Sequence, residues 1–231
     1  MRHRLAPALL AAAVGAGPAS AGPWPYAAGE GFASAAWRGT PATGTEYSAL
    51  YLEYGLGRRW SVGVDAGRAI GGATKTIAFV GRARAKEAAG PRIGWQLGAG
   101  RIDGQAVVRP GLSIGRAFGN GVGPWARSGW VAADGLAEIG VAFDAWGRPV
   151  VETDVKLDVT VGLSHGGGRK TILQLQAGQE EGDPPFRRLE LRQVQPLYEG
   201  TSLTLGAYRD LSDGGAAGLV AGATGTDTGG S

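Results

Sequence analysis

The segment Val150–Ser164 alternates between apolar and polar residues along its whole length, and this pattern constrains the fold more than any other feature of the chain. Successive side chains of a β-strand point to opposite faces, so a period of two predicts one strand with an apolar and a polar face. The polar face carries Glu152, Asp154, Lys156 and Asp158. Strands of soluble sheets usually have about 5–6 residues, whereas a tilted strand that crosses a bilayer needs roughly 9–11. The segment is therefore typical of a membrane-spanning strand.

Weaker alternation recurs along the rest of the chain, separated by turn-forming residues. Glycine, at 43 of 231 residues, is interleaved with β-branched and aromatic residues, which disfavours helices and suits strands with a crowded inner surface. We predict strands at residues 31–38, 46–56, 59–67, 74–85, 90–101, 105–118, 123–132, 136–145, 149–164, 170–180, 186–197 and 201–210, with a weak thirteenth segment at 216–222. Bacterial barrels have even strand numbers. The expected fold is all-β, an antiparallel up-and-down transmembrane β-barrel of about 12 strands, and a soluble exported β-sandwich is the alternative.

The N-terminus has the features of a cleavable signal peptide. Arg2 and Arg4 make a basic start, an apolar stretch follows, and Ala19-Ser20-Ala21 is a small-residue cleavage signal. We therefore expect a signal peptide at residues 1–21, export through the Sec pathway, and a barrel domain at residues 22–222. Tryptophan and tyrosine residues near the predicted strand ends are expected to form girdles at the membrane interface, namely Trp24, Trp37, Trp60, Trp125, Trp130, Trp146, Tyr26, Tyr47 and Tyr198.

Several stretches resemble an uncharacterised family of proteobacterial outer-membrane β-barrel proteins. These stretches are "GPWPYAAGEGFASAAWRGT", "YSALYLEYGLGRRWSVGVDAG", "VVRPGLSIGRAFG", "ILQLQAG" and "SLTLGAYRDLS". The resemblance spans most of the chain after residue 21 and implies a barrel fold in the outer membrane. It also implies contact with outer-membrane lipid and lipopolysaccharide and insertion by the barrel assembly machinery. It carries over no catalytic residue.

The C-terminal sequence departs from the pattern of such barrels, which usually end in a strand with a terminal aromatic residue. Here the chain ends "GLVAGATGTDTGGS". We expect the last strand to be degraded after Val220, a disordered tail at residues 223–231, and an unclosed edge whose backbone groups hydrocarbon could not satisfy.

Motifs that suggest chemistry are better explained as strands and turns. Gly111-Leu112-Ser113-Ile114-Gly115 matches G-x-S-x-G, but no helix can follow it, so we expect Gly111, Ser113 and Gly115 to be alternate inward positions of one strand. Ser164 and His165 are neighbours that point to opposite faces, and "GGGRKT" lacks the order of a phosphate-binding loop. We therefore predict no catalytic site, no enzyme activity, no metal site and no cofactor.

Charges on the polar strand faces are the candidate functional residues, because these faces would line the lumen. They are Glu152, Asp154, Lys156, Asp158, Arg188, Glu190, Arg192, Arg82, Arg84, Arg92 and Arg109. Separated charges in a wet lumen would make a small passive porin-like channel for small solutes. Tightly paired charges would instead make a non-conducting structural or surface barrel, and a lipid-modifying enzyme is the remaining alternative. Both signs occur on these faces, so the sequence leaves the first two open. No basic patch indicates a nucleic-acid partner, and nothing indicates the oligomeric state.

Overall fold

The computed structural model describes residues 23–228 except residues 25, 42–43, 58, 86–89, 120–127, 144–145, 181 and 213–214. The expected signal peptide at residues 1–21 lies outside the described residues. The strands are β1 (Glu30–Thr40), β2 (Thr45–Gly57), β3 (Trp60–Ala69), β4 (Thr74–Ala85), β5 (Arg92–Ile102), β6 (Gln105–Phe118), β7 (Gly129–Phe143), β8 (Pro149–Ser164), β9 (Lys170–Gln179), β10 (Phe186–Tyr198), β11 (Thr201–Asp210) and β12 (Ala217–Thr228). One short 3-10 turn, Gly166–Gly168, joins β8 to β9.

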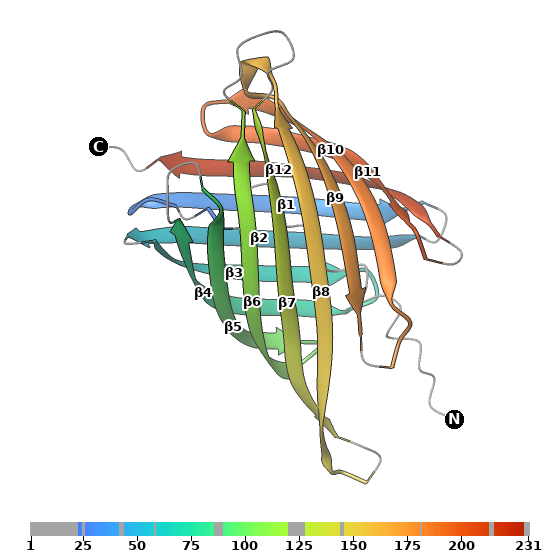
Figure 1. Cartoon of the computed structure of the whole chain (residues 1–231). Coiled ribbons are helices and arrows are strands. Elements are labelled where there is room, and N and C mark those ends of the chain that lie inside the picture. Colours follow the sequence, from blue (N-terminus) through green and yellow to red (C-terminus); the bar gives the residue numbers. More distant parts are fainter. Residues whose placement is uncertain are drawn as a thin grey trace.

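Each strand pairs antiparallel with the next one along the chain, and β12 pairs with β1, so the sheet closes into a barrel. In Figure 1 the front strands β6–β10 cross over the back strands β12 and β1–β3, as tilted barrel strands do. Glu30 at the start of β1 lies opposite Thr228 at the end of β12, so both ends of the described chain meet at one mouth, which we call the terminal mouth. The predicted antiparallel barrel with 12 strands is confirmed. Within the described residues no helix is long and apolar enough to cross a membrane.

Two strand predictions were wrong, but the total of 12 strands is still correct because one error removes a strand and the other adds one. The segments 123–132 and 136–145 were expected to be separate strands, but β7 runs unbroken from Gly129 to Phe143 through Asp134-Gly135, a local turn signal. Pairing with β6 on one side and β8 on the other overrides that local preference. The weak segment at 216–222 is a full strand, and it continues to Thr228. The expected unclosed edge and a tail beginning at residue 223 are therefore also wrong.

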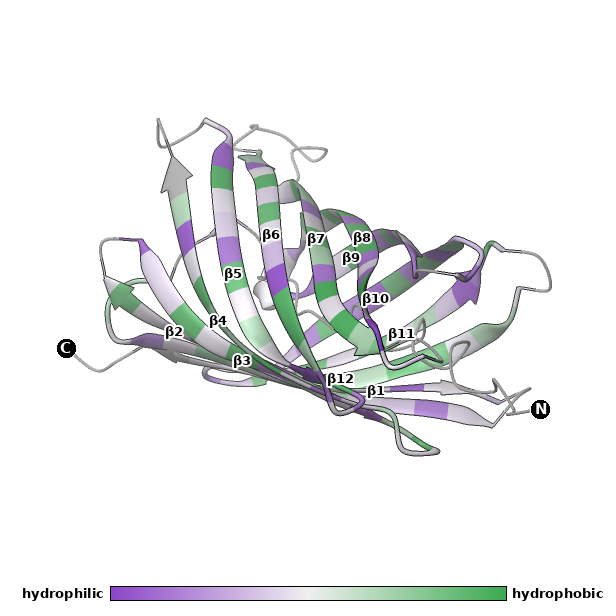
Figure 2. Cartoon of the chain, turned by 90° about the horizontal axis from the view of Figure 1, so that it is seen from below, coloured by the Kyte–Doolittle hydropathy of each residue, from purple (hydrophilic) through white to green (hydrophobic). Residues whose placement is uncertain are grey.

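The outer surface of the barrel is apolar, whereas its inner face carries the polar residues. Along β8, Val155 and Leu157 are exposed on the outside, while Lys156 between them is buried on the inside. The same alternation runs through the other strands and appears as bands in Figure 2. A water-soluble barrel would bury its apolar face, so this arrangement is that of a membrane barrel.

Small residues on the inner face make room for large side chains from neighbouring strands. A methyl group on Gly98 of β5 would lie 2.8 Å from Cγ2 of Ile77 on β4. Ile77 packs there with Ile102 and Val107 in a buried apolar cluster. Between β5 and β6, Asp103 and Gly104 both have positive φ (50° and 81°), as a two-residue hairpin turn with the strands' twist requires.

The predicted aromatic girdle is only partly correct. Trp37 is exposed on the outer face, and Trp60 lies on it in edge contact with Trp95. Trp146 and Tyr198 are exposed at opposite mouths, whereas Trp130 lies inside the barrel against the inward Gly162. Tyr47 is likewise buried inside the barrel, and Trp24 and Tyr26 also lie inside it. Trp125 lies outside the described residues.

Candidate functional site in the lumen

The structure places the predicted charged residues of β8 and β10, with Arg92 of β5 and Arg109 of β6, on the lumen side of the barrel. On each strand they alternate with outward apolar residues. The predicted residues on this inner face are Glu152, Asp154, Lys156, Asp158, Arg188, Glu190, Arg192, Arg92 and Arg109. Most of them are buried, so they form contacts with one another rather than with open water.

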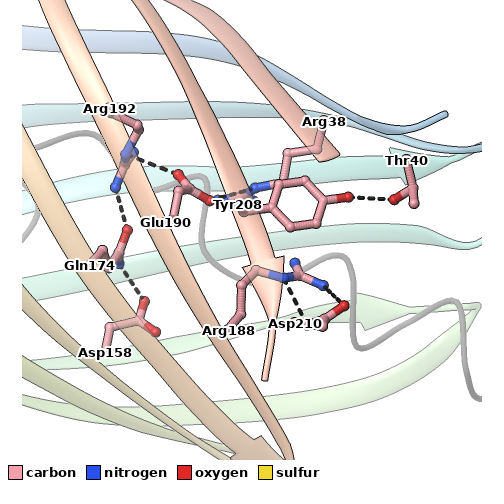
Figure 3. A network of polar contacts seen from close by, with 9 residues as sticks. All are labelled: Arg38, Thr40, Asp158, Gln174, Arg188, Glu190, Arg192, Tyr208 and Asp210. Atoms are coloured by element: carbon pink, nitrogen blue, oxygen red, sulfur yellow. Dashed lines mark hydrogen bonds and ion pairs between the residues drawn. The ribbon is translucent and has the colours of Figure 1, made fainter. Parts of the chain in front are cut away.

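The first network, which we call the Glu190 network, joins β1, β8, β9 and β10 across the lumen (Figure 3). Arg38 donates from Nε (3.1 Å) and Nη2 (2.9 Å) to Oε2 of Glu190. Nε of Arg192 lies 2.9 Å from Oε1 of Glu190, an ion pair whose N–H is not aligned as a hydrogen bond. Arg192 also donates to the amide oxygen of Gln174, whose Nε2 donates to Asp158 at 3.1 Å. The side chain of Glu190 is 0% exposed, so its negative charge is neutralised by two arginines rather than by water.

Beside this network, Arg188 and Asp210 form a more open pair. Nε and Nη2 of Arg188 donate to the two carboxylate oxygens of Asp210 at 3.2 and 3.3 Å. The guanidinium also lies 4.5 Å from the ring centre of Tyr208, whose hydroxyl hydrogen-bonds to Thr40 at 2.5 Å. The Asp210 side chain is 26% exposed, so solvent reaches this part of the lumen.

The second network, which we call the Asp65–Lys156 chain, spans β3, β4, β6, β7 and β8. Nζ of Lys75 donates to Asp65 at 2.8 Å, and Arg109 donates to the same carboxylate oxygen. Arg109 also lies 3.9 Å from Glu138, which accepts a hydrogen bond from Lys156 at 2.5 Å. The chain therefore alternates positive and negative groups from one wall of the barrel towards the other.

Sequence reasoning missed several members of these networks. Arg38, Asp65, Lys75 and Glu138 were not among the predicted residues, although each alternates with outward residues on its strand and could have been found by the same criterion. Their partners could not have been found, because Arg38 and Glu190 are 152 positions apart.

Besides Arg188, several predicted residues lie outside the two networks. Asp154 is on the inner face of β8, opposite Glu138 of β7. Glu152 is exposed near the mouth opposite the terminal mouth, where Gln105 donates to it at 3.4 Å. Arg92 lies at the start of β5, near the terminal mouth, where it pairs with Gly115 of β6. The expectation that Arg82 points into the lumen is wrong: it shares the outer face with Trp95 and lies 4.8 Å from the ring centre of Trp60. The side chain of Arg84 lies outside the described residues.

A cavity of about 530 Å³ occupies the lumen near the terminal mouth. Its wall is formed mainly by β1 and β9–β12 and includes Tyr26, Ser34, Lys170, Thr204 and Thr226. Arg192 is the deepest residue of β10 in this wall, since Val194, Pro196 and Tyr198 follow it towards the mouth. The cavity is thus a vestibule with a mixed polar and apolar wall, and it leads to the Glu190 network.

The motifs that resembled catalytic sequences take the expected structural places. Gly111, Ser113 and Gly115 are alternate inward positions of β6. Nε2 of His165, in the turn after β8, lies 2.8 Å from the hydroxyl of Thr171. Among the described residues no three or more His, Cys, Asp or Glu side chains are grouped as metal ligands.

Comparison with known proteins identifies an architecture but no sequence family. No family model matches the chain, and no curated protein matches it in sequence. The structure of the NanC porin in its rhombohedral crystal form is similar, with a TM-score of 0.61 at 8% identity over 84% of this chain and 98% of that chain. The KdgM porin is similar to the same degree, with a TM-score of 0.61 at 6% identity over 84% and 98%. The family resemblance stays a prediction, whereas the barrel that it implied is the fold of this chain, which is built like these two porins.

Proposed function

We propose that this protein is a narrow porin-like channel for small solutes in the bacterial outer membrane, and that its two ion-pair networks hold the lumen nearly closed at mid-height. The observation that carries the proposal is a vestibule that leads from one mouth to paired charges inside a barrel with an apolar outer surface. The shared architecture with two porins supports the same function. The proposal includes export by a signal peptide, insertion by the barrel assembly machinery, and contact of the outer face with outer-membrane lipid and lipopolysaccharide.

The burial of the charges sets the expected conductance. Charges that line an open pore contact water, but Glu190 is 0% exposed and Arg109 and Lys156 are 3% exposed at their side chains. A passing ion must therefore displace or separate existing ion pairs. We expect small unit conductance, with selectivity governed by which partner of each pair faces the ion.

A non-conducting structural barrel is the second candidate, and the same burial favours it. The two candidates differ in how they explain that charged side chains, and not apolar ones, fill this part of the lumen. Apolar side chains can fill a lumen without the desolvation cost of buried ions, and this barrel uses them at Ile77, Ile102 and Val107. Ion pairs elsewhere in the same lumen can separate and hydrate, which suits a channel better than a permanent seal.

Planar-bilayer recording on the purified protein tests the proposal. The double variant Arg38→Ala/Glu190→Ala removes a matched pair of opposite charges and much of the volume at the centre of the Glu190 network. We expect small discrete steps from the wild type and several-fold larger steps from the double variant. Glu152→Ala is the control, because it removes an inward carboxylate that lies outside the networks.

Two results would contradict the channel function. Silence from both the wild type and the double variant, each shown to be folded, would establish the non-conducting barrel. Large steps from the wild type that the double variant leaves unchanged would show that the Glu190 network does not limit the lumen.

A further inference from the structure

The chain immediately before β1 lies inside the barrel rather than along its rim. The side chain of Pro23 is fully buried. A methyl group on Gly94, an inward position of β5, would lie only 3.3 Å from Cα of Pro23. The next residue, Trp24, also lies in the lumen. A methyl group on Gly115, an inward position of β6, would collide with its indole ring.

The following residues cross the inner face of β2. A methyl group on Gly55 would collide with the carbonyl oxygens of Tyr26 and Ala27. Inward glycines on β2, β5 and β6 thus leave the space that this segment occupies. A side chain at Gly55 or Gly115 would displace its backbone or its indole, whereas one at Gly94 would make only a tight contact with Pro23.

Specific contacts hold the segment in that space. The amide of Gly29 donates to the carbonyl of Gly55 at 3.0 Å, and the amide of Ala27 donates to the carboxylate of Glu30 at 2.8 Å. The ring of Tyr26 stacks on Phe32 with ring centres 5.8 Å apart. That stack continues through Tyr51 to Phe79, at 6.3 and 5.5 Å, so the segment joins an aromatic row inside β1, β2 and β4.

We propose that Pro23, Trp24, Tyr26, Ala27 and Ala28 form an internal plug, the N-terminal plug, which closes the β2–β6 half of the terminal mouth. Tyr26 is the boundary of the plug, because it stacks on Phe32 and also lines the vestibule. Entry from this mouth is therefore confined to the half of the lumen that faces β9–β12. The plug follows from packing alone and holds whether or not the barrel conducts.

A disulfide between the plug and the wall tests this placement in the intact protein. The chain has no cysteine, so introduced pairs are unambiguous. The contact at Gly94 places its Cα within about 5 Å of that of Pro23, inside the ~4.4–6.8 Å that a disulfide spans. We expect Pro23→Cys/Gly94→Cys to form an intramolecular disulfide under mild oxidation, seen as a linked peptide by mass spectrometry.

The matched control pairs Pro23→Cys with Ser202→Cys on β11, on the opposite wall of the same mouth, and it should remain unlinked. Equal linking of both pairs would show a segment that wanders in the lumen and would overturn the plug. So would an unlinked Pro23/Gly94 pair whose two thiols both react with a water-soluble maleimide in folded protein.

A second measurement avoids substitution at the contact itself. Ala83 is buried on the inner face of β4 and pairs with Gly94. We expect Ala83→Cys to react with a water-soluble thiol reagent about ten-fold faster when residues 23–27 are deleted, because Ala83 lies beside the contact of Gly94 with Pro23 and the deletion opens that space to water. Ser202→Cys, on the vestibule wall, should react at the same rate in both backgrounds. Equal rates for Ala83→Cys with and without residues 23–27 would overturn the proposal.

Discussion

Removal of the Glu190 carboxylate is the most informative single change to the lumen. Glu190→Ala leaves Arg38 and Arg192 facing each other, at 2% and 5% exposure, without the anion between them. Removing one member of a buried ion pair costs about 3–5 kcal/mol, because an uncompensated charge stays out of water. Water that enters the vacated space hydrates the two guanidinium groups partly, so we expect the free energy of unfolding to fall by about 3 kcal/mol, the lower end of that range.

Urea unfolding of the barrel in detergent micelles, followed from both directions, measures this loss as a lower midpoint at unchanged slope. Asp210→Ala is the matched control, because it also removes a carboxylate paired with a lumen arginine. The Asp210 side chain is 26% exposed, so water can replace it beside the single arginine Arg188, and its removal should lower the free energy of unfolding by less, about 1–2 kcal/mol. Glu190→Gln keeps an oxygen acceptor for Arg38, so its loss in free energy of unfolding should lie between the losses of the two alanine variants.

A loss from Glu190→Ala that does not exceed the loss from Asp210→Ala would refute the reasoning. That result would mean that water already reaches the Glu190 network in solution and that the lumen at this level is open. The closed mid-height proposed for the channel would then be wrong as well.

Further predictions concern the loop beyond β9 and the packing of the inner face. Burial raises the pKa of Glu180 to about 7. Between about pH 5 and about pH 8 the folded state therefore holds a proton that the unfolded state has released, so the free energy of unfolding should fall as the pH rises. Urea titrations of Glu180→Gln should show a smaller dependence on pH over this range. Gly98→Ala places a methyl group 2.8 Å from Ile77 and should lower the free energy of unfolding by about 1–3 kcal/mol, whereas Gly166→Ala, with open space around it, should leave it unchanged.

The fold was largely predictable because the pattern that specifies it is local. Val150–Ser164 was expected as one strand and is β8, which spans Pro149–Ser164. The errors occurred where local and non-local preferences conflict. Asp134-Gly135 signals a turn but lies inside a ladder between two neighbours. β12 is rich in glycine, alanine and threonine and has a weak apolar face, so only its pairing with β1 and β11 reveals it.

The site was predictable as a face but not as a network. Alternation shows that Glu190 and Arg192 point inwards, yet it does not show that Arg38 of β1 meets them from across the lumen. Whether charges of a barrel are separated or paired depends on barrel diameter and strand stagger, which no single strand contains. That distinction separates a wide pore from a sealed lumen, which explains why the sequence left both functions open.

The filling of the lumen differs from one wall to the other, and this restricts where the proposed channel can open. Along β2–β6 the ion pairs of Asp65, Lys75 and Arg109 lie beside the N-terminal plug and the apolar cluster of Ile77, and neither the plug nor the cluster gains hydration by moving apart. Along β8–β11 the filling is ion pairs, which water can separate, and the vestibule ends at one of their members, Arg192. The proposed channel would therefore open along the β8–β11 wall, where the vestibule meets Arg192 and Glu190. Changes at Arg192 should consequently alter ion selectivity, whereas conservative changes within the apolar cluster should alter only stability.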